Sequence, residues 1–209
     1  MTPENWFAFT LALVLGAMSP GPSLALVLRN TVRGGRRHGI LTGLGHGIGF
    51  GVYAFTTAAG LSLALTTHRS IEAILHWGCV TLLIWLGFTF IRKANLTPQY
   101  DVEEELEQYQ QSDGAVFMQG FLIALMNPKI IAWMLAIYTP FITPDAPVVT
   151  SLTMSLLATF TDASWYITVA AVLSGPRTIT LLRRHAHIVQ SAMGALMLIF
   201  AGLLAGGVL

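Results

Sequence analysis

A proline-rich break inside a long apolar run is the feature that most constrains how this chain can fold. The run Trp6–Leu28 carries no charged residue, and its residues 19–23 read Ser-Pro-Gly-Pro-Ser. Pro20 and Pro22 lack the backbone N–H that a helix needs, and a proline ring clashes with the preceding turn. The run therefore predicts two helical pieces that meet at this break.

Composition predicts that this run lies in a membrane. Only 10% of the 209 residues are charged and 54% are apolar, whereas soluble domains carry about 25% charged residues. Six apolar runs have at least the ~20 residues that a helix needs to cross the hydrocarbon layer. They are Trp6–Leu28, Gly39–Leu65, Ile71–Ile91, Ala115–Tyr138, Val148–Leu173 and Ile188–Val208.

The distribution of Lys and Arg predicts the orientation of the chain. Nine of the eleven basic residues fall in the loops between runs one and two, three and four, and five and six. Arg69 is the only one in the other loops, and Lys129 lies inside the fourth run. Because Lys and Arg collect in cytoplasmic loops, we expect these three loops in the cytoplasm and both termini on the outer side.

The longest loop, Arg92–Gly114, divides the six runs three and three. An odd number of spans in each half gives the halves opposite orientations, as in inverted-repeat transporters. We therefore expect one transmembrane domain (1–209), made of a first repeat (1–91), an acidic cytoplasmic loop (92–114) and a second repeat (115–209). The expected fold class is an all-α membrane protein with six transmembrane helices, the first and fourth broken at proline-containing motifs.

A second break, Asn127-Pro128-Lys129, interrupts the fourth run. Irregular backbone at membrane depth is tolerated only where it is buried in protein or lines a cavity. Transporters build substrate sites from such breaks in corresponding positions of two repeats. We therefore predict a substrate site formed by Pro20, Gly21, Pro22, Ser23, Asn127, Pro128 and Lys129.

Ionisable side chains inside the spans extend this predicted site. Away from the span ends there are three, His46, Lys129 and Asp162, and such groups are functional candidates because they are costly in lipid. Lys129 and Asp162 fall near the middle of their runs, where opposite charges can offset each other. Together they match the carboxylate and the ammonium of an amino acid. The alternative is a Lys–Asp pair that only joins two helices.

His46 and Asp162 are the candidates for proton coupling. Histidine is the side chain that changes protonation near neutral pH, and His46 lies at a depth similar to that of the first break. We assign Asp162 to an ammonium group or a transported proton, and Tyr166, one turn later on the same face, to the substrate site. A merely structural His46, bonded to a carbonyl freed at the break, is the alternative.

The second run carries five glycines at alternate positions, and small residues let membrane helices approach closely. A spacing of four places them on two faces, both of which we expect to pack against other helices. One face holds Gly43, Gly47 and Gly51, and the other holds Gly45 and Gly49. Gly202 and Gly206 in the sixth run are expected to pack within the protomer, with a dimer contact as the alternative.

In the order and spacing of its motifs the chain resembles the LysE/RhtB amino-acid exporters, small inner-membrane proteins of bacteria. The matching motifs are Pro20-Gly21-Pro22, Leu28-Arg29-Asn30, Gly45–Gly49, Gly60-Leu61, Asn127-Pro128-Lys129 and Pro140-Phe141. The resemblance runs nearly end to end. It implies six membrane helices, export of amino acids or close derivatives in exchange for protons, and a homodimer. Phe50 is a departure, because many members carry an acidic residue there.

An intramembrane enzyme and a passive channel for small polar solutes are the alternative functions. The sequence contains neither the H-E-x-x-H motif of zinc proteases nor G-x-S-x-G. Two breaks in inverted positions favour alternating access over a fixed pore. We therefore expect a transporter of the bacterial inner membrane and no enzyme, with no cofactor, metal or nucleic acid. Its expected partners are an amino-acid substrate, protons, the lipid bilayer and a second copy of the chain.

Overall fold

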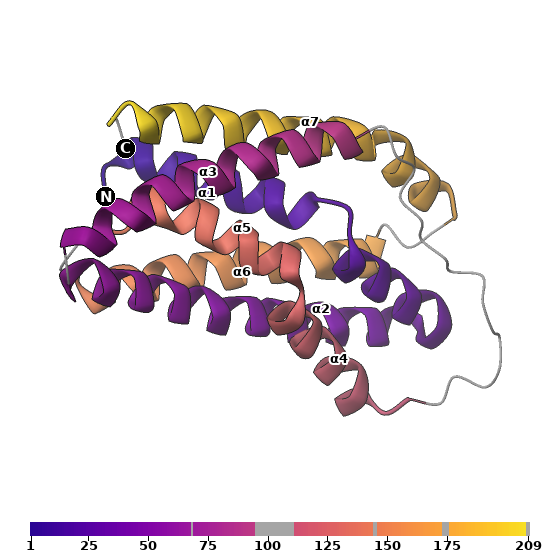
Figure 1. Ribbon diagram of the computed structural model, residues 1–209. Helices are drawn as coiled ribbons and strands as arrows, with labels where there is room; N and C mark the ends of the chain where they lie inside the picture. Colours follow the sequence, from indigo (N-terminus) through magenta and orange to yellow (C-terminus); the bar gives the residue numbers. More distant parts are fainter. Residues whose placement is uncertain (68, 95–110, 144–145, 173–175, 208–209) are drawn as a thin grey trace.

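The computed structural model describes the whole chain except residues 68, 95–110, 144–145, 173–175 and 208–209. The described residues form seven α-helices and one short 3₁₀-helix and include no strand (Figure 1). In chain order these are α1 (Pro3–Met18), α2 (Pro22–Thr67), α3 (Arg69–Lys93), α4 (Asp113–Met126), α5 (Pro128–Tyr138), η1 (Thr139–Phe141), α6 (Val148–Val172) and α7 (Pro176–Ala205). The start of α1 and the end of α7 lie at the same end of the bundle (Figure 1).

The first predicted break separates α1 from α2. The side chain of Thr2 caps α1 by accepting a hydrogen bond from the N–H of Asn5 at 3.3 Å. The helix stops at Ser19, which is extended, because a residue before proline is pushed out of the helical region. Pro22 then opens α2, at a position where its missing N–H would have had no partner in any case.

The second predicted break separates α4 from α5. Asn127 is extended because it precedes Pro128, and its side-chain oxygen accepts a hydrogen bond from the N–H of Lys129 at 3.0 Å. One asparagine thus ends α4 and caps the first turn of α5. The structure confirms both breaks at the residues that the sequence indicated.

The structure also indicates which helices have the length and the apolar composition to span a membrane. In the described part of the chain, no single helix is both long enough and apolar enough to cross a bilayer. Two pairs pass that test on length and composition when taken together. They are α1 with Pro22–Ser62, bent by 53°, and α4 with Lys129–Phe141, bent by 56°.

The connection between the first two apolar runs is helical, and the expectation of a loop there is wrong. The helix α2 passes through Arg29 and Arg37 and is interrupted only at Gly35, with φ 79° and ψ 174°. A positive φ of this kind is open to glycine and strained for other residues. A single residue therefore turns the chain between the two parts of α2.

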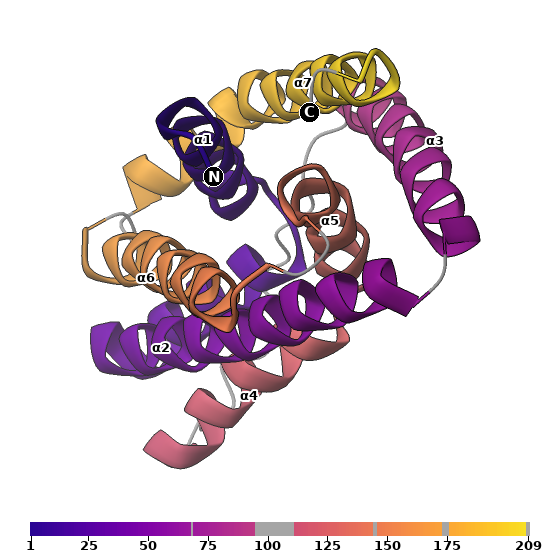
Figure 2. The same ribbon diagram turned by 90° about the vertical axis from the view of Figure 1, so that its left-hand side faces the viewer.

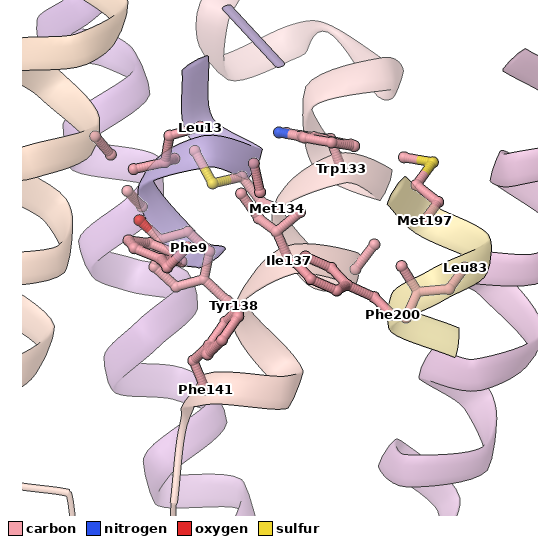
Figure 3. Close-up of a cluster of buried hydrophobic side chains, with 14 of the residues drawn as sticks. Phe9, Leu13, Leu83, Trp133, Met134, Ile137, Tyr138, Phe141, Met197 and Phe200 are labelled. Carbon is pink, nitrogen blue, oxygen red and sulfur yellow. The ribbon is translucent and has the colours of Figure 1, made fainter. Parts of the chain in front are cut away.

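The helix α5 lies in the middle of the bundle and contacts α1, α2 and α3 (Figure 2). Its apolar side chains meet those of α1 in a large buried cluster (Figure 3). There Phe9 of α1 packs edge-on against Tyr138 and Phe141, with ring centroids 5.1 Å and 5.6 Å apart. This cluster fixes α1 and α5 against each other, so their broken ends are held in a constant relation.

The glycines of α2 confirm the predicted close packing on two faces. An added Cβ at Gly45 would lie 2.0 Å from the carbonyl oxygen of Phe117 in α4. One at Gly47 would lie 2.5 Å from the Cβ of Ala163 in α6. The helix α2 is therefore clamped between α4 and α6 at distances that only glycine permits.

Two further expectations concern the glycines of the last apolar run and the acidic loop. Gly202 is exposed, with nothing within 4 Å of an added Cβ, and Gly206 is exposed as well. The prediction that they pack within the protomer is therefore wrong. Most of the acidic loop 92–114 falls on residues 95–110 and so lies outside the described residues.

Candidate functional site

The two helix breaks meet at a cavity in the middle of the bundle. About 30 Å³ of it is open to the centres of water molecules, which is room for about two waters. Seven of the ten residues assigned from sequence line it, namely Gly21, Ser23, His46, Asn127, Lys129, Asp162 and Tyr166. Of the other three, Pro20 contributes its carbonyl oxygen to the site, and Pro22 and Pro128 open α2 and α5.

A buried histidine–aspartate pair forms one side of the cavity. The Nδ1 atom of His46 in α2 lies 2.6 Å from Oδ2 of Asp162 in α6, and both side chains are almost wholly buried. The Nε2 atom of His46 lies 2.8 Å from Oγ of Ser23. Phe50 stacks parallel to the imidazole at 6.3 Å and Tyr166 meets it edge-on at 4.6 Å. The ring is therefore fixed between a carboxylate and a hydroxyl.

Hydrogen bonds continue from this pair to the second break. The side-chain amide of Asn127 donates to Oγ of Ser23 at 3.3 Å. With Nδ1–H of His46 donating to Asp162, the Ser23 hydroxyl donates to Nε2 and accepts from Asn127, and every group is satisfied. One chain of hydrogen bonds thus runs from α6 across α2 to the junction of α4 and α5.

Lys129 forms the other side of the cavity, at the first break. Its ammonium donates hydrogen bonds to Oγ of Ser19 and to the carbonyl oxygen of Pro20, the latter at 2.8 Å. It also lies 5.1 Å from the ring centroid of Phe90 in α3. Both partners lie in the segment between α1 and α2, so the lysine binds the first break itself. A side chain that begins in α5 therefore connects the second break to the first.

The structure thus refines the predicted relation of Lys129 to Asp162. Both line one cavity, with the ammonium held at the first break and the carboxylate held by His46. Each break also brings together the negative end of one helix and the positive start of the next, so helix ends contribute both signs at each break. The charges of the site are complementary to those of a small solute with an anionic and a cationic group.

Sequence reasoning missed six residues that line the cavity. Ser19 had a usable signal, because it directly precedes the first proline of the break. The other five are apolar residues in apolar helices, and of these only Phe50 stood out in the sequence, as a departure from the family pattern. They are Gly16, Phe50, Ile130, Trp133 and Met193.

A second polar network lies beyond the cavity and ties α2 to α4. Asn30 is fully buried, and its side-chain amide donates to Oγ1 of Thr42 at 2.9 Å and to Oε1 of Gln119 at 3.1 Å. Arg29 donates to the same glutamine oxygen at 3.3 Å. Thr42 lies beyond Gly35, so the network joins both parts of α2 to α4.

An all-helical bundle whose broken helices enclose a cavity with buried charges has the architecture of a secondary transporter. The model of the LysE type translocator family matches residues 14–207, and the chain belongs to this family. Members of the family are membrane transporters rather than enzymes. The sequence-based predictions of the family and of a transporter are therefore confirmed.

Characterised relatives align with nearly the whole chain. It is 26% identical over 213 residues to the homoserine/homoserine lactone efflux proteins of Salmonella typhimurium and Salmonella typhi, covering 98% of each chain. It is 27% identical over 196 residues to the threonine efflux protein of Salmonella typhi, covering 93% of each chain. No solved structure matches the chain.

Proposed function

We propose that this protein exports a small amino acid, or a close derivative, from the cytoplasm in exchange for protons. The observation that carries the proposal is the cavity at the two helix breaks, with the ammonium of Lys129 on one side and the His46–Asp162 pair on the other. The names of the relatives, which are homoserine/homoserine lactone and threonine efflux proteins, support this substrate class.

Lys129 and Asp162 lie on two sides of the cavity, and each suits one end of an amino acid. The carboxylate would take the place of Pro20 and Ser19 as partner of Lys129, and the positive N-terminal end of α5 would add to its binding. The ammonium would lie toward Asp162. A zwitterion compensates both the buried charge of Asp162 and the partly buried charge of Lys129, whereas a solute with one charge leaves the other uncompensated.

Proton exchange would use the His46–Asp162 pair. When the histidine is neutral, its Nε2 accepts from the hydroxyl of Ser23, and when it is protonated, Nε2–H donates to that oxygen. Protonation therefore reverses the direction of the bond that links the pair to Asn127 at the second break. Because a protonated histidine and a substrate ammonium compete for the same carboxylate, the proton and the substrate exclude each other. Such mutual exclusion is what an exchanger requires.

The proposal also includes the number of spans, their arrangement in two repeats, their orientation and the oligomeric state. Six spans would consist of α1 with the start of α2, the rest of α2, α3, α4 with α5, α6, and α7. Two inverted repeats are supported by the similar breaks, since α1 and α4 have 16 and 14 residues and each ends just before a residue–proline step. We place the protein in the bacterial inner membrane as a homodimer, with both termini outside.

The proposal is tested by efflux from proteoliposomes loaded with a panel of labelled amino acids. A pH gradient that drives protons inward should accelerate release of homoserine or threonine, and Asp162→Asn in the same liposomes should release neither above the protein-free level. Release that is insensitive to the gradient and does not saturate would indicate a passive channel. Release of no amino acid from the panel would refute the proposed substrate class.

A further inference from the structure

One residue of the cavity wall carries an unpaired hydrogen-bond donor. Trp133 of α5 is 4% exposed and lines the cavity, and its indole nitrogen Nε1 is buried with no hydrogen-bond partner among the described residues. Leaving a buried donor unpaired costs about 1–3 kcal/mol. Most buried polar groups in native proteins have a partner, so this N–H requires an explanation. The interactions of His46, Asp162 and Lys129 do not involve it.

A glycine of α1 makes room for this donor. A Cβ added at Gly16 would lie 2.4 Å from Nε1 of Trp133 and 2.8 Å from Cε2 of the same ring. The nitrogen-bearing edge of the indole therefore rests on a position where no larger residue fits, and both residues line the cavity. Figure 3 shows the nitrogen on the side of the ring that faces α1. The glycine at position 16 thus leaves space for the indole of Trp133, which a larger side chain from α1 would occupy.

The spacing of residues along α5 places Trp133 relative to Lys129, the residue proposed to bind the substrate carboxylate. Trp133 follows Lys129 by four residues, so the two side chains lie on one face of the helix and about 6 Å apart along its axis. A substrate whose carboxylate meets Lys129 extends its own side chain over a comparable distance. The remaining wall there is apolar, formed by residues such as Ile130 and Met193. The indole N–H is then the polar group available to that part of the substrate.

We propose that Trp133 determines the substrate side chain by donating its indole N–H to an oxygen acceptor on it. This inference rests on the proposed function and specifies its substrate class as neutral amino acids, or their derivatives, with a hydroxyl or carbonyl oxygen in the side chain. An indole nitrogen donates and cannot accept, so a side-chain ammonium finds no partner beside it. An aliphatic side chain leaves the donor unpaired and is selected against.

The test compares substrate pairs that differ only in a hydroxyl and a methyl group. Export of homoserine and norvaline, and of threonine and valine, is measured in proteoliposomes for the wild type and for Trp133→Phe. In the variant the preference for the hydroxylated member should fall about five- to tenfold, the worth of one buried hydrogen bond. Export of the aliphatic member should be unchanged or faster.

Trp165→Phe is the matched control. Trp165 of α6 also has a buried Nε1 without a partner among the described residues, but it is not part of the cavity lining. The same substitution there should leave the preference unchanged. If Trp133→Phe fails to insert, Gly16→Ala replaces it, since its methyl group must displace the indole nitrogen.

The outcomes separate this inference from the proposed function. If the wild type exports no member of either pair, the proposed function fails. If the wild type prefers the hydroxylated members and the inserted variant keeps that preference, the assignment of Trp133 alone is overturned. A fall in the preference that also occurs in Trp165→Phe would likewise overturn it.

Discussion

Replacing Gly45 with alanine should loosen the contact between α2 and α4. The added methyl carbon would lie 2.0 Å from the backbone oxygen of Phe117, whereas real Cβ contacts essentially never fall below 3.0 Å. The oxygen belongs to the backbone and has no rotamer that would move it away. The helices must therefore separate by about 1 Å, and overpacking of this kind costs about 1–3 kcal/mol.

The matched control is Gly60→Ala in the same helix. Nothing lies within 4 Å of a Cβ added there, so alanine should stabilise the helix by about 0.5–1 kcal/mol through its higher propensity. The same gain in propensity applies at Gly45, so the two variants should differ by the overpacking cost, about 1–3 kcal/mol in free energy of unfolding. Unfolding of the purified proteins by SDS in mixed micelles, followed by tryptophan fluorescence, measures this difference. Equal stability of Gly45→Ala and Gly60→Ala would refute the close approach of α2 and α4.

Three substitutions at polar positions give further predictions. Asp162→Asn should insert normally but export neither homoserine nor threonine, with or without a pH gradient, because the buried carboxylate proposed to bind the ammonium and to hold His46 is lost; export by this variant would contradict the proposed role of Asp162. Lys129→Met should discriminate less between an amino acid and its decarboxylated amine in competition binding, because a missing carboxylate then leaves no buried charge unpaired; unchanged discrimination would remove the lysine from carboxylate binding. Asn30→Leu should lower the free energy of unfolding in detergent by about 1–3 kcal/mol, because Thr42 and Gln119 each lose a donor; wild-type stability would show that the network does not hold α2 to α4.

The helix breaks and the glycine faces could be predicted from sequence because each has a local cause. Proline restricts the residue before it wherever it occurs, so the breaks at Pro20 and Pro128 required no knowledge of the fold. A spacing of four fixes which glycines share a face, as the opposite contacts of Gly45 and Gly47 show. Such features depend on a few neighbouring residues.

The partners of the buried groups could not be predicted in the same way. Residue counting gave the depth of Lys129 and Asp162 but not the direction in which each helix faces. The bond from Asp162 to His46 depends on how α2 and α6 are rotated against each other, which no local pattern encodes. Trp133 gave no signal, because one aromatic residue in an apolar helix resembles any other until the fold shows that it lines the cavity and that its nitrogen has no partner. The open surroundings of Gly202 likewise depend on where α7 packs.

The central claim is that one cavity holds either the amino acid or the proton, and equilibrium binding tests it most directly. Binding of labelled homoserine and threonine to the purified protein is measured in detergent over a range of pH. If a single proton competes with the substrate, the dissociation constant should rise by up to about tenfold for each unit of falling pH. In His46→Gln it should become independent of pH across the same range. Wild-type binding that does not change with pH, or a pH dependence that survives in His46→Gln, would contradict the account.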